Sequence, residues 1–271
     1  AMLALTLYLL RLFGQGMMTH TAMTAMGRWY TGHRGRAVSL VALGHQCGEA
    51  IFPLLTVSLF AWLGWRQAWV LGAAVLVVLA LPVLYLLLLK EREPQHTDAP
   101  EKRGSNKHWQ RNEVLRDPLF WRLIGAVMAP SFIGTAIFFH QDYLVTLRQW
   151  PAQSFASAFI MLASITVMSS LLAGQLIDRF SGVSLLPYFL LPLAMGCGVI
   201  WAVEEAYGIY LFMGLLGVSA GMSSVLYGSL WPELYGSKHL GSIRSVITAM
   251  LVLSSALGPG ITGWLIDVGV A

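Results

Sequence analysis

Apolar runs of about 20 residues recur along this chain, and they restrict its possible folds more than any other feature. A helix of that length crosses the hydrocarbon core of a bilayer. Of the 271 residues, 56% are hydrophobic and 11% are charged, whereas soluble domains carry about 25% charged residues. A soluble helical core could not cover so many nearly uncharged runs with polar surface. The sequence therefore predicts an all-α, polytopic membrane protein.

Eight of these runs are expected to span the membrane. Helices are favoured because the strands of a membrane barrel would alternate apolar and polar residues over about ten positions. The expected bounds are residues 3–26, 37–62, 67–89, 120–146, 153–177, 183–203, 207–230 and 243–266.

The basic residues are distributed unequally between the two sides of the expected membrane. Alternating spans place 14 of the 17 lysines and arginines on one side and two, Arg66 and Arg148, on the other, with Arg11 inside the first span. The basic side is expected to be cytoplasmic, so the first span enters from outside and the chain ends outside. The net charge of +4 therefore reports topology and does not indicate nucleic-acid binding.

One long polar segment, residues 90–118, has three spans before it and five after it. It carries charges of both signs and few residues that could pack, which is typical of a flexible cytoplasmic linker. A short amphipathic helix near Trp109–Leu115 is weakly signalled. We expect the remainder of an N-terminal bundle at 1–90, a linker at 91–119 and a C-terminal bundle at 120–271 that lacks its last span.

The two cysteines, Cys47 and Cys197, both fall inside expected spans. Zinc needs three or four clustered ligands, and neither cysteine is placed for a metal site or a disulfide. Both are interpreted as small core residues. The sequence predicts no metal and no cofactor.

The chain also contains an internal repeat. Residues 35–61 align without a gap with residues 241–267, at a shift of 206, and the identical pairs are Gly35/Gly241, Ser39/Ser245, Ala50/Ala256, Pro53/Pro259, Thr56/Thr262 and Leu59/Leu265. The preceding spans align at a shift of 205, with Gly16/Gly221, Met17/Met222 and Tyr30/Tyr235 identical. Parallel repeats six spans apart are a known plan of transporters.

Several motifs resemble those of the major facilitator superfamily. The segment GQLIDRFSG (174–182) resembles the family's cytoplasmic loop motif through Gly174, Leu176, Asp178, Arg179 and Gly182. The segment RLFGQG (11–16) resembles the arginine motif of the fourth span, and RWYTGHRGRAVSLVALG (28–44) resembles the entry to the fifth span in monocarboxylate-porter-like members.

A further motif, GPGITG (258–263), resembles the Gly-Pro motif found in the fifth span of the family's antiporters. Here it lies in the later, repeat-equivalent span, and the fifth-span copy keeps only Gly44, Gly48 and Pro53. This departure weakens an inference of antiport.

The resemblance implies a two-bundle fold of twelve spans, of which this chain supplies the fourth to the eleventh. Both ends of the chain look cut, and no signal peptide is visible. The resemblance also implies alternating access, with Asp178 and Arg179 latching the inward gate. Ordinary interfacial charge is the alternative reading of these two residues.

The candidate functional residues of the first two spans are Arg11, His20, His45, Gln46 and Glu49. Ionisable groups are costly in hydrocarbon and mark functional sites by default. At about 1.5 Å per residue, Arg11 and Glu49 lie roughly 25 and 20 Å from the inner face, and His20 and His45 roughly 12 and 14 Å. We therefore expect Glu49 to face Arg11 and His45 to face His20.

The later copy of the repeat lacks this polar set. Its equivalents are Leu216, Val225, Leu251, Val252 and Ser255, although a purely architectural need should appear in both copies. Our hypothesis is that protonation of Glu49 releases Arg11, whose guanidinium then meets an anionic substrate. The alternative is a buried ion pair that only fixes helix register.

His140 and Gln141 lie near the outer end of the fourth expected span. They are candidates for the outer vestibule and for substrate or proton binding. An interfacial histidine with no transport role is the alternative.

These features predict a monomeric secondary transporter in a bacterial cytoplasmic (inner) membrane, in contact with lipid and using protons as the coupling ion. The expected substrate is a small organic molecule, with a monocarboxylate as the first choice. A drug/proton antiporter that exports amphipathic compounds is a second hypothesis. An intramembrane enzyme built on His20, His45 and Glu49 is a third, although the main prediction is that the protein is not an enzyme. A truncated remnant that does not transport also stays open.

Overall fold

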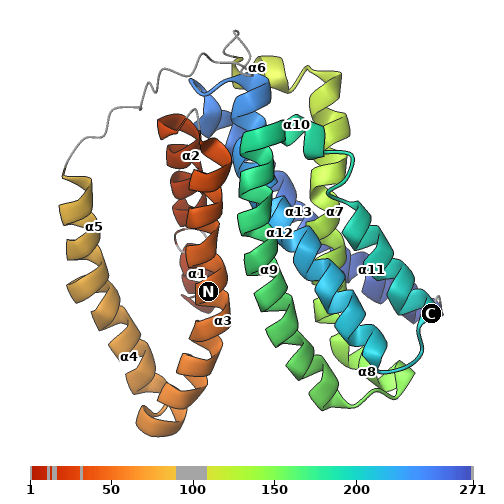
Figure 1. Ribbon diagram of the computed structural model, residues 1–271. Coiled ribbons are helices and arrows are strands. Elements are labelled where there is room, and N and C mark those ends of the chain that lie inside the picture. The colour runs from red at the N-terminus through yellow and green to blue at the C-terminus, as the bar shows by residue number, and fades with distance from the viewer. Residues whose placement is uncertain (1, 11–12, 14–16, 31–32, 90–108, 270–271) are drawn as a thin grey trace.

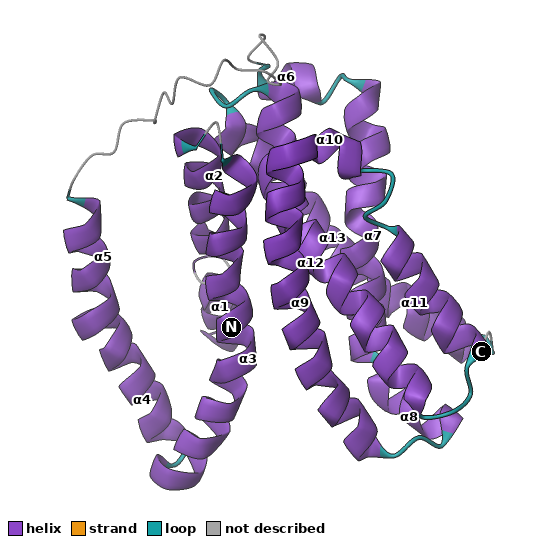
Figure 2. Cartoon of the chain, viewed as in Figure 1, coloured by secondary structure: helices purple, strands orange, loops and turns teal. Residues whose placement is uncertain are grey.

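The computed structural model describes residues 2–10, 13, 17–30, 33–89 and 109–269. Within these ranges it describes only the backbone at residues 3, 4, 7, 10, 49, 50, 53, 54, 57, 152, 153, 155 and 156. Helices make up nearly all of this part of the chain (Figures 1 and 2), which confirms the all-α prediction. The elements are α1 (Met2–Leu10), α2 (Met18–Trp29), α3 (Arg34–Leu63), α4 (Trp65–Val75), the π-helical turn η2 (Leu76–Ala80), α5 (Leu81–Leu88), α6 (Arg111–Val114), α7 (Pro118–Phe139), α8 (Gln141–Arg148), α9 (Ala152–Phe180), α10 (Gly182–Leu185), α11 (Leu191–Ala202), α12 (Tyr207–Tyr235) and α13 (Leu240–Asp267).

Five helical segments in the described part of the chain are long and apolar enough to cross a membrane: Trp65–Leu88, Pro118–Phe139, Ser157–Phe180, Tyr207–Tyr235 and Leu240–Asp267. They coincide with five of the eight predicted spans. The second predicted span corresponds to α3, whose 30 residues also exceed the thickness of a bilayer core. The first corresponds to α1 and α2, and residues between them lie outside the described ranges.

The sixth predicted span, residues 183–203, is divided in the structure. Its parts are α10 and α11, and residues 186–190 between them form turns. Pro187 and Pro192 lack the N–H that a continuous helix would use at these positions, which accounts for the break. The prediction of one continuous helix is therefore wrong at this span.

The fourth predicted span, residues 120–146, also ends early. Asp117 caps α7 by accepting a hydrogen bond from Leu119 N–H, and Pro118 occupies the first turn, where its missing N–H costs nothing. At the other end His140 leaves helical geometry, with φ −99° and ψ 22°, and separates α7 from the short α8. His140 therefore lies at a helix break and not inside a span.

The C-terminal bundle is built around α12. In its most apolar 18-residue stretch 61% of the residues are buried, against 22% in α7. Helices α9 and α11 pack along α12, and α13 packs along α7. Aromatic side chains fill one end of the bundle, where the rings of Trp231 and Tyr235 are stacked and Phe120 lies against both. A second apolar cluster around Phe212 and Leu193 fills the other end.

The ends of α2 and α3 that carry the basic residues pack against this bundle. This end of the molecule, which also holds α6 and α10 (Figure 1), is called the inner end below. Val38 of α3 is fully buried beside Gly228 of α12, and Leu240 of α13 lies beside Gly27 of α2. The outer half of α3 instead exposes Ile51, Phe52 and Leu55. The contact between the N-terminal helices and the C-terminal bundle is therefore concentrated at the inner end.

Among the described residues, the segment from α4 to α5 packs against α3 next to the turn that joins them and lies apart from the C-terminal bundle (Figure 1). None of its most apolar 18-residue stretch is buried. Its exposed side chains include Trp69, Val78 and Leu86. Such a uniformly apolar surface suits contact with lipid or with further membrane helices.

The short helix expected near Trp109–Leu115 is present as α6. Gln110 and Glu113 form a capping box at its start, and Val114 is buried in the inner cluster. The Trp109 N–H donates to the Tyr235 carbonyl at 3.1 Å, and the Tyr235 hydroxyl donates to Asp117 at 2.9 Å. These contacts fix the segment before α7 to the inner end of α12.

Candidate functional site: the helix contacts at the inner end

Asp178 links the inner end of α9 to the start of α3. Its carboxylate accepts hydrogen bonds from the N–H groups of Gly35 at 2.7 Å and Arg36 at 3.2 Å. N–H groups at a helix start have no partner within the helix, and a negative charge there also meets the positive end of the helix dipole. Arg36 Nε lies 3.6 Å from the same carboxylate, but the Arg36 side chain is 62% exposed. The backbone contacts therefore carry most of this link.

The backbones of α3 and α9 cross closely at this point. A Cβ atom on Gly174 would lie 2.9 Å from the Gly35 carbonyl oxygen and 2.6 Å from Ser39 Oγ. A Cβ atom on Gly35 would meet the Gly174 carbonyl oxygen and, at 2.8 Å, the Asp178 carboxylate. The first glycine of the loop motif is thus the residue that lets the carboxylate of the same motif reach the start of α3.

Arg179, the other residue of the predicted latch, is exposed at the end of α9. Its guanidinium lies 5.3 Å from the centre of the Phe180 ring. The gating role of Asp178 and Arg179 stays a prediction.

Gln46 joins α3 to two helices of the C-terminal bundle. It is 8% exposed. Its Oε1 accepts a hydrogen bond from Ser170 of α9 at 3.1 Å, and its Nε2 donates to Ser224 of α12 at 3.4 Å. Both ends of the amide are therefore engaged across the contact between the two halves of the chain.

His20 lies on α2, the helix that packs against α13, which carries Arg244. The His20 Nδ1 is buried and has no hydrogen-bond partner among the described residues. The expected approach of His20 to His45 stays a prediction. His45 is exposed on α3, where it shares a helical face with Glu49.

The predicted pair of Arg11 and Glu49 falls outside what the structure describes. Arg11 is outside the described ranges, and Glu49 has its backbone in α3 but no described side chain. Their contact and their role in coupling therefore stay predictions.

His140 and Gln141 lie at the outer end, between α7 and α8. His140 Nε2 is 3.1 Å from the Pro259 carbonyl oxygen of α13, and a Cβ atom on Gly263 would touch the same imidazole. Gln141 is half-buried at the start of α8. The Gly-Pro segment of α13 is therefore a packing surface for α7, and Gly258 lies directly on the Phe132 backbone.

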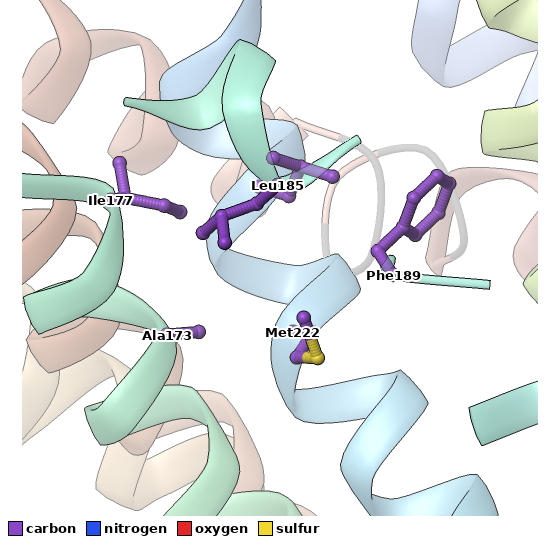
Figure 3. Close-up of a pocket in the computed structure, with 6 residues that line it drawn as sticks. Ala173, Ile177, Leu185, Phe189 and Met222 are labelled. Atoms are coloured by element: carbon purple, nitrogen blue, oxygen red, sulfur yellow. The ribbon is translucent and has the colours of Figure 1, made fainter. Parts of the chain in front are cut away.

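A small pocket inside the C-terminal bundle is entirely apolar. It is lined by Ala173, Ile177, Leu185, Phe189, Met222 and Leu226, five of which are labelled in Figure 3. Binding sites need a few polar groups to orient and select a solute. This pocket lacks them, and none of the predicted site residues lines it.

A comparison of the sequence with known protein families identifies the family of the chain. The sequence model of the Major Facilitator Superfamily matches residues 2–268. The chain belongs to this superfamily. It is also similar to the phosphoglycerate transporter protein of Salmonella typhimurium, with 24% identity over 288 aligned positions. The alignment covers 93% of this chain and 61% of the relative, so the chain spans about three-fifths of the relative's length.

Membership in the superfamily identifies the chain as part of an integral membrane protein, and the relative is named as a transporter. The monocarboxylate-porter-like subtype stays a prediction.

Sequence reasoning missed the residues that complete these contacts. Ser170 and Ser224 are ordinary residues of apolar helices, and no spacing distinguishes them. Arg244 was not singled out by sequence reasoning, yet it is 8% exposed. A usable signal existed, since an arginine one turn inside a helix start opposes the helix dipole and requires compensation.

Proposed function

We propose that this chain is part of a secondary transporter that moves a small organic anion across the membrane by proton-coupled alternating access. Membership in the superfamily supports the transport role. The observation that carries the mechanism is the packed inner end, where Val38 lies on Gly228 and Asp178 caps α3. Alternating access requires a contact of this kind between two bundles, closed at one end of the site while the other end opens.

An organic anion is favoured as the substrate by two features. The relative is named as a transporter of phosphoglycerate, which is an organic anion. In this chain, Arg11 lies in the first predicted span, and an arginine fork suits a carboxylate or a phosphate. A monocarboxylate remains the first choice from sequence, and a phosphorylated carboxylate is the choice that the relative suggests.

Proton coupling is assigned to Glu49. A carboxyl group at the depth expected for Glu49 changes its protonation with access to water, and protonation would release Arg11 for the substrate. His20, His45, Gln46, His140 and Gln141 complete the proposed polar lining.

A drug/proton antiporter is the second proposal. It was suggested by the Gly-Pro motif, but the contact of Gly258 with the Phe132 backbone accounts for that motif through packing. An intramembrane metal enzyme is a remote third proposal, and the described residues contain no group of three or more His, Cys, Asp or Glu side chains that could hold a metal ion.

The proposed setting is the cytoplasmic membrane of a bacterium, with the inner end of the bundle facing the cytoplasm and the protein monomeric. The division into an N-terminal bundle at 1–90, a linker at 91–119 and a C-terminal bundle at 120–271 is part of the same proposal.

The experiment is an uptake assay with the full-length protein in proteoliposomes, using labelled lactate and phosphoglycerate as probes. We expect an imposed proton gradient to drive uptake of at least one probe, and Arg11→Gln to abolish it. Glu49→Gln should leave counterflow exchange but remove the response to the gradient. Full gradient dependence in Glu49→Gln would refute the coupling role. Substrate-stimulated proton release that ignores Arg11→Gln would favour the antiporter.

A further inference from the structure

Arg244 is a buried charge that the transport proposal has not used. It is the fifth residue of α13, one turn inside the start of the helix, and is 8% exposed. Its Nη1 donates to the Tyr227 carbonyl at 2.9 Å, while its Nε is buried and has no hydrogen-bond partner among the described residues. Among the same residues no carboxylate forms an ion pair with it. The guanidinium therefore keeps both charge and hydrogen-bonding capacity that the described part of the chain does not satisfy.

Two further buried groups without partners lie on the facing helix, α2. His20 Nδ1 and Thr24 Oγ1 have no hydrogen-bond partner among the described residues. His20 and Thr24 are four residues apart, so they share one face of α2. Thr24 lies against Gly241 of α13, where a Cβ atom would be 3.9 Å from its Cγ2, and α2 packs along α13 at this end. This face of α2 is thus opposite the first turn of α13.

The unsatisfied groups share one chemistry. A guanidinium, an imidazole N–H and a hydroxyl can all donate hydrogen bonds, and the first carries a positive charge. The start of α13 adds the positive end of a helix dipole. Buried charges and buried polar groups are costly unless they are paired. The group that satisfies all of them together is an oxyanion.

We propose that Arg244, His20 and Thr24 form an oxyanion-binding subsite at the inner end, between α2 and α13, which takes a carboxylate or a phosphate group. The subsite deepens the proposed function, and it rests on that function only in assigning the anion to the transported solute. Closure of the inner end buries Arg244, and the bound anion neutralises the charge that closure buries. Occupancy therefore favours the closed inner end, which couples solute binding to the gate.

The test uses the full-length protein purified in detergent, without any transport. Thermal unfolding is followed with inorganic phosphate or acetate as the probe, against chloride at matched ionic strength. We expect at least one probe to raise the unfolding temperature beyond chloride. Arg244→Gln should weaken the apparent affinity about tenfold or more, because a charge-assisted contact is lost. Thr24→Val, which keeps the side-chain volume, should weaken it about threefold to tenfold.

Arg148 provides the matched control. It is also an arginine that donates to backbone carbonyls, those of Ile200 and Trp201, but it lies at the outer end beside Glu204. Arg148→Gln should keep the full response to the anion.

The possible outcomes distinguish a phosphorylated ligand from a carboxylate, and failure of the subsite from failure of the proposed function. A response to phosphate alone indicates a phosphorylated solute, and a response to acetate alone indicates a carboxylate. Absence of a response to both, or an equal response in wild type and Thr24→Val, overturns the subsite even if Arg244→Gln does not fold. Binding without uptake of any organic anion would refute the proposed function and leave the subsite standing.

Discussion

Asp178 shows how one carboxylate can connect two halves of a membrane protein. It sits at the end of one long helix and satisfies two N–H groups at the start of another, 143 and 142 residues earlier in the chain. The contact combines a hydrogen-bonded cap with a favourable charge at a helix start.

Asp178→Asn should therefore lower the free energy of unfolding by about 1–2 kcal/mol, because the amide keeps one acceptor but loses the charge. Arg36→Gln is the matched control. Its side chain is mostly exposed, so loss of this ion pair should cost less than about 1 kcal/mol. Denaturant or thermal unfolding in detergent measures both, and equal effects of the two substitutions would contradict this account of the link.

Gln46 gives two predictions, one for an apolar and one for an acidic substitution. Gln46→Leu should change the free energy of unfolding by only about 1 kcal/mol, because Ser170 and Ser224 also donate to backbone carbonyls of their own helices.

Gln46→Glu places an ionisable group at a position that is 8% exposed. The buried acid is tolerated when neutral, so its stability relative to wild type should fall as the pH rises from 5 to 8. Unfolding temperatures at the two pH values test this, and a difference that does not change with pH would contradict it.

Sequence reasoning found some of these residues and could not find others. Asp178 was identified because its motif has a distinctive spacing of glycine, leucine and charge. Gln46 was identified because it belongs to the polar set that the later copy of the repeat replaces, but its partners are serines that no sequence pattern distinguishes. The burial of Arg244 depends on how α2, α12 and α13 pack, and hydropathy alone does not contain that information.

At the scale of helices, some features could likewise be predicted from the sequence and others could not. Long helices follow from apolar length, and the start of α3 at Arg34 and of α13 at Leu240 are 206 residues apart, which equals the shift of the sequence repeat. The break between α10 and α11 could have been expected from Pro187 and Pro192. Close helix crossings are harder to predict, because a glycine in an apolar helix carries no information about which helix it meets.

The crossing of α3 and α9 provides the prediction for elements. Gly174→Ala places a methyl group against Ser39 and the Gly35 carbonyl, and it should cost about 1–3 kcal/mol through overpacking. Gly125→Ala in α7 is the control, since nothing lies within 4 Å of its Cβ position. We expect that control to be neutral or slightly stabilising. Equal losses at the two positions, measured by thermal unfolding, would show that the crossing is not tight.

At the scale of the molecule, the N-terminal helices approach the C-terminal bundle at the inner end, whereas the segment from α4 to α5 lies apart (Figure 1). The repeat and the family resemblance predicted two bundles, and family membership is confirmed. Which end of the bundles is closed could not be predicted from sequence, because a transporter visits both arrangements with the same residues.

The packed inner end must separate during transport if alternating access is correct. The most direct test is a reversible crosslink between Val38 and Gly228, in a protein whose Cys47 and Cys197 are replaced by serine. Val38 Cβ lies 3.2 Å from the Cβ position of residue 228, which is close to the separation that a disulfide needs. With Val38→Cys and Gly228→Cys combined, oxidation should stop uptake by the full-length protein, reduction should restore it, and neither single substitution should respond. Unchanged uptake in the fully crosslinked protein would contradict the account.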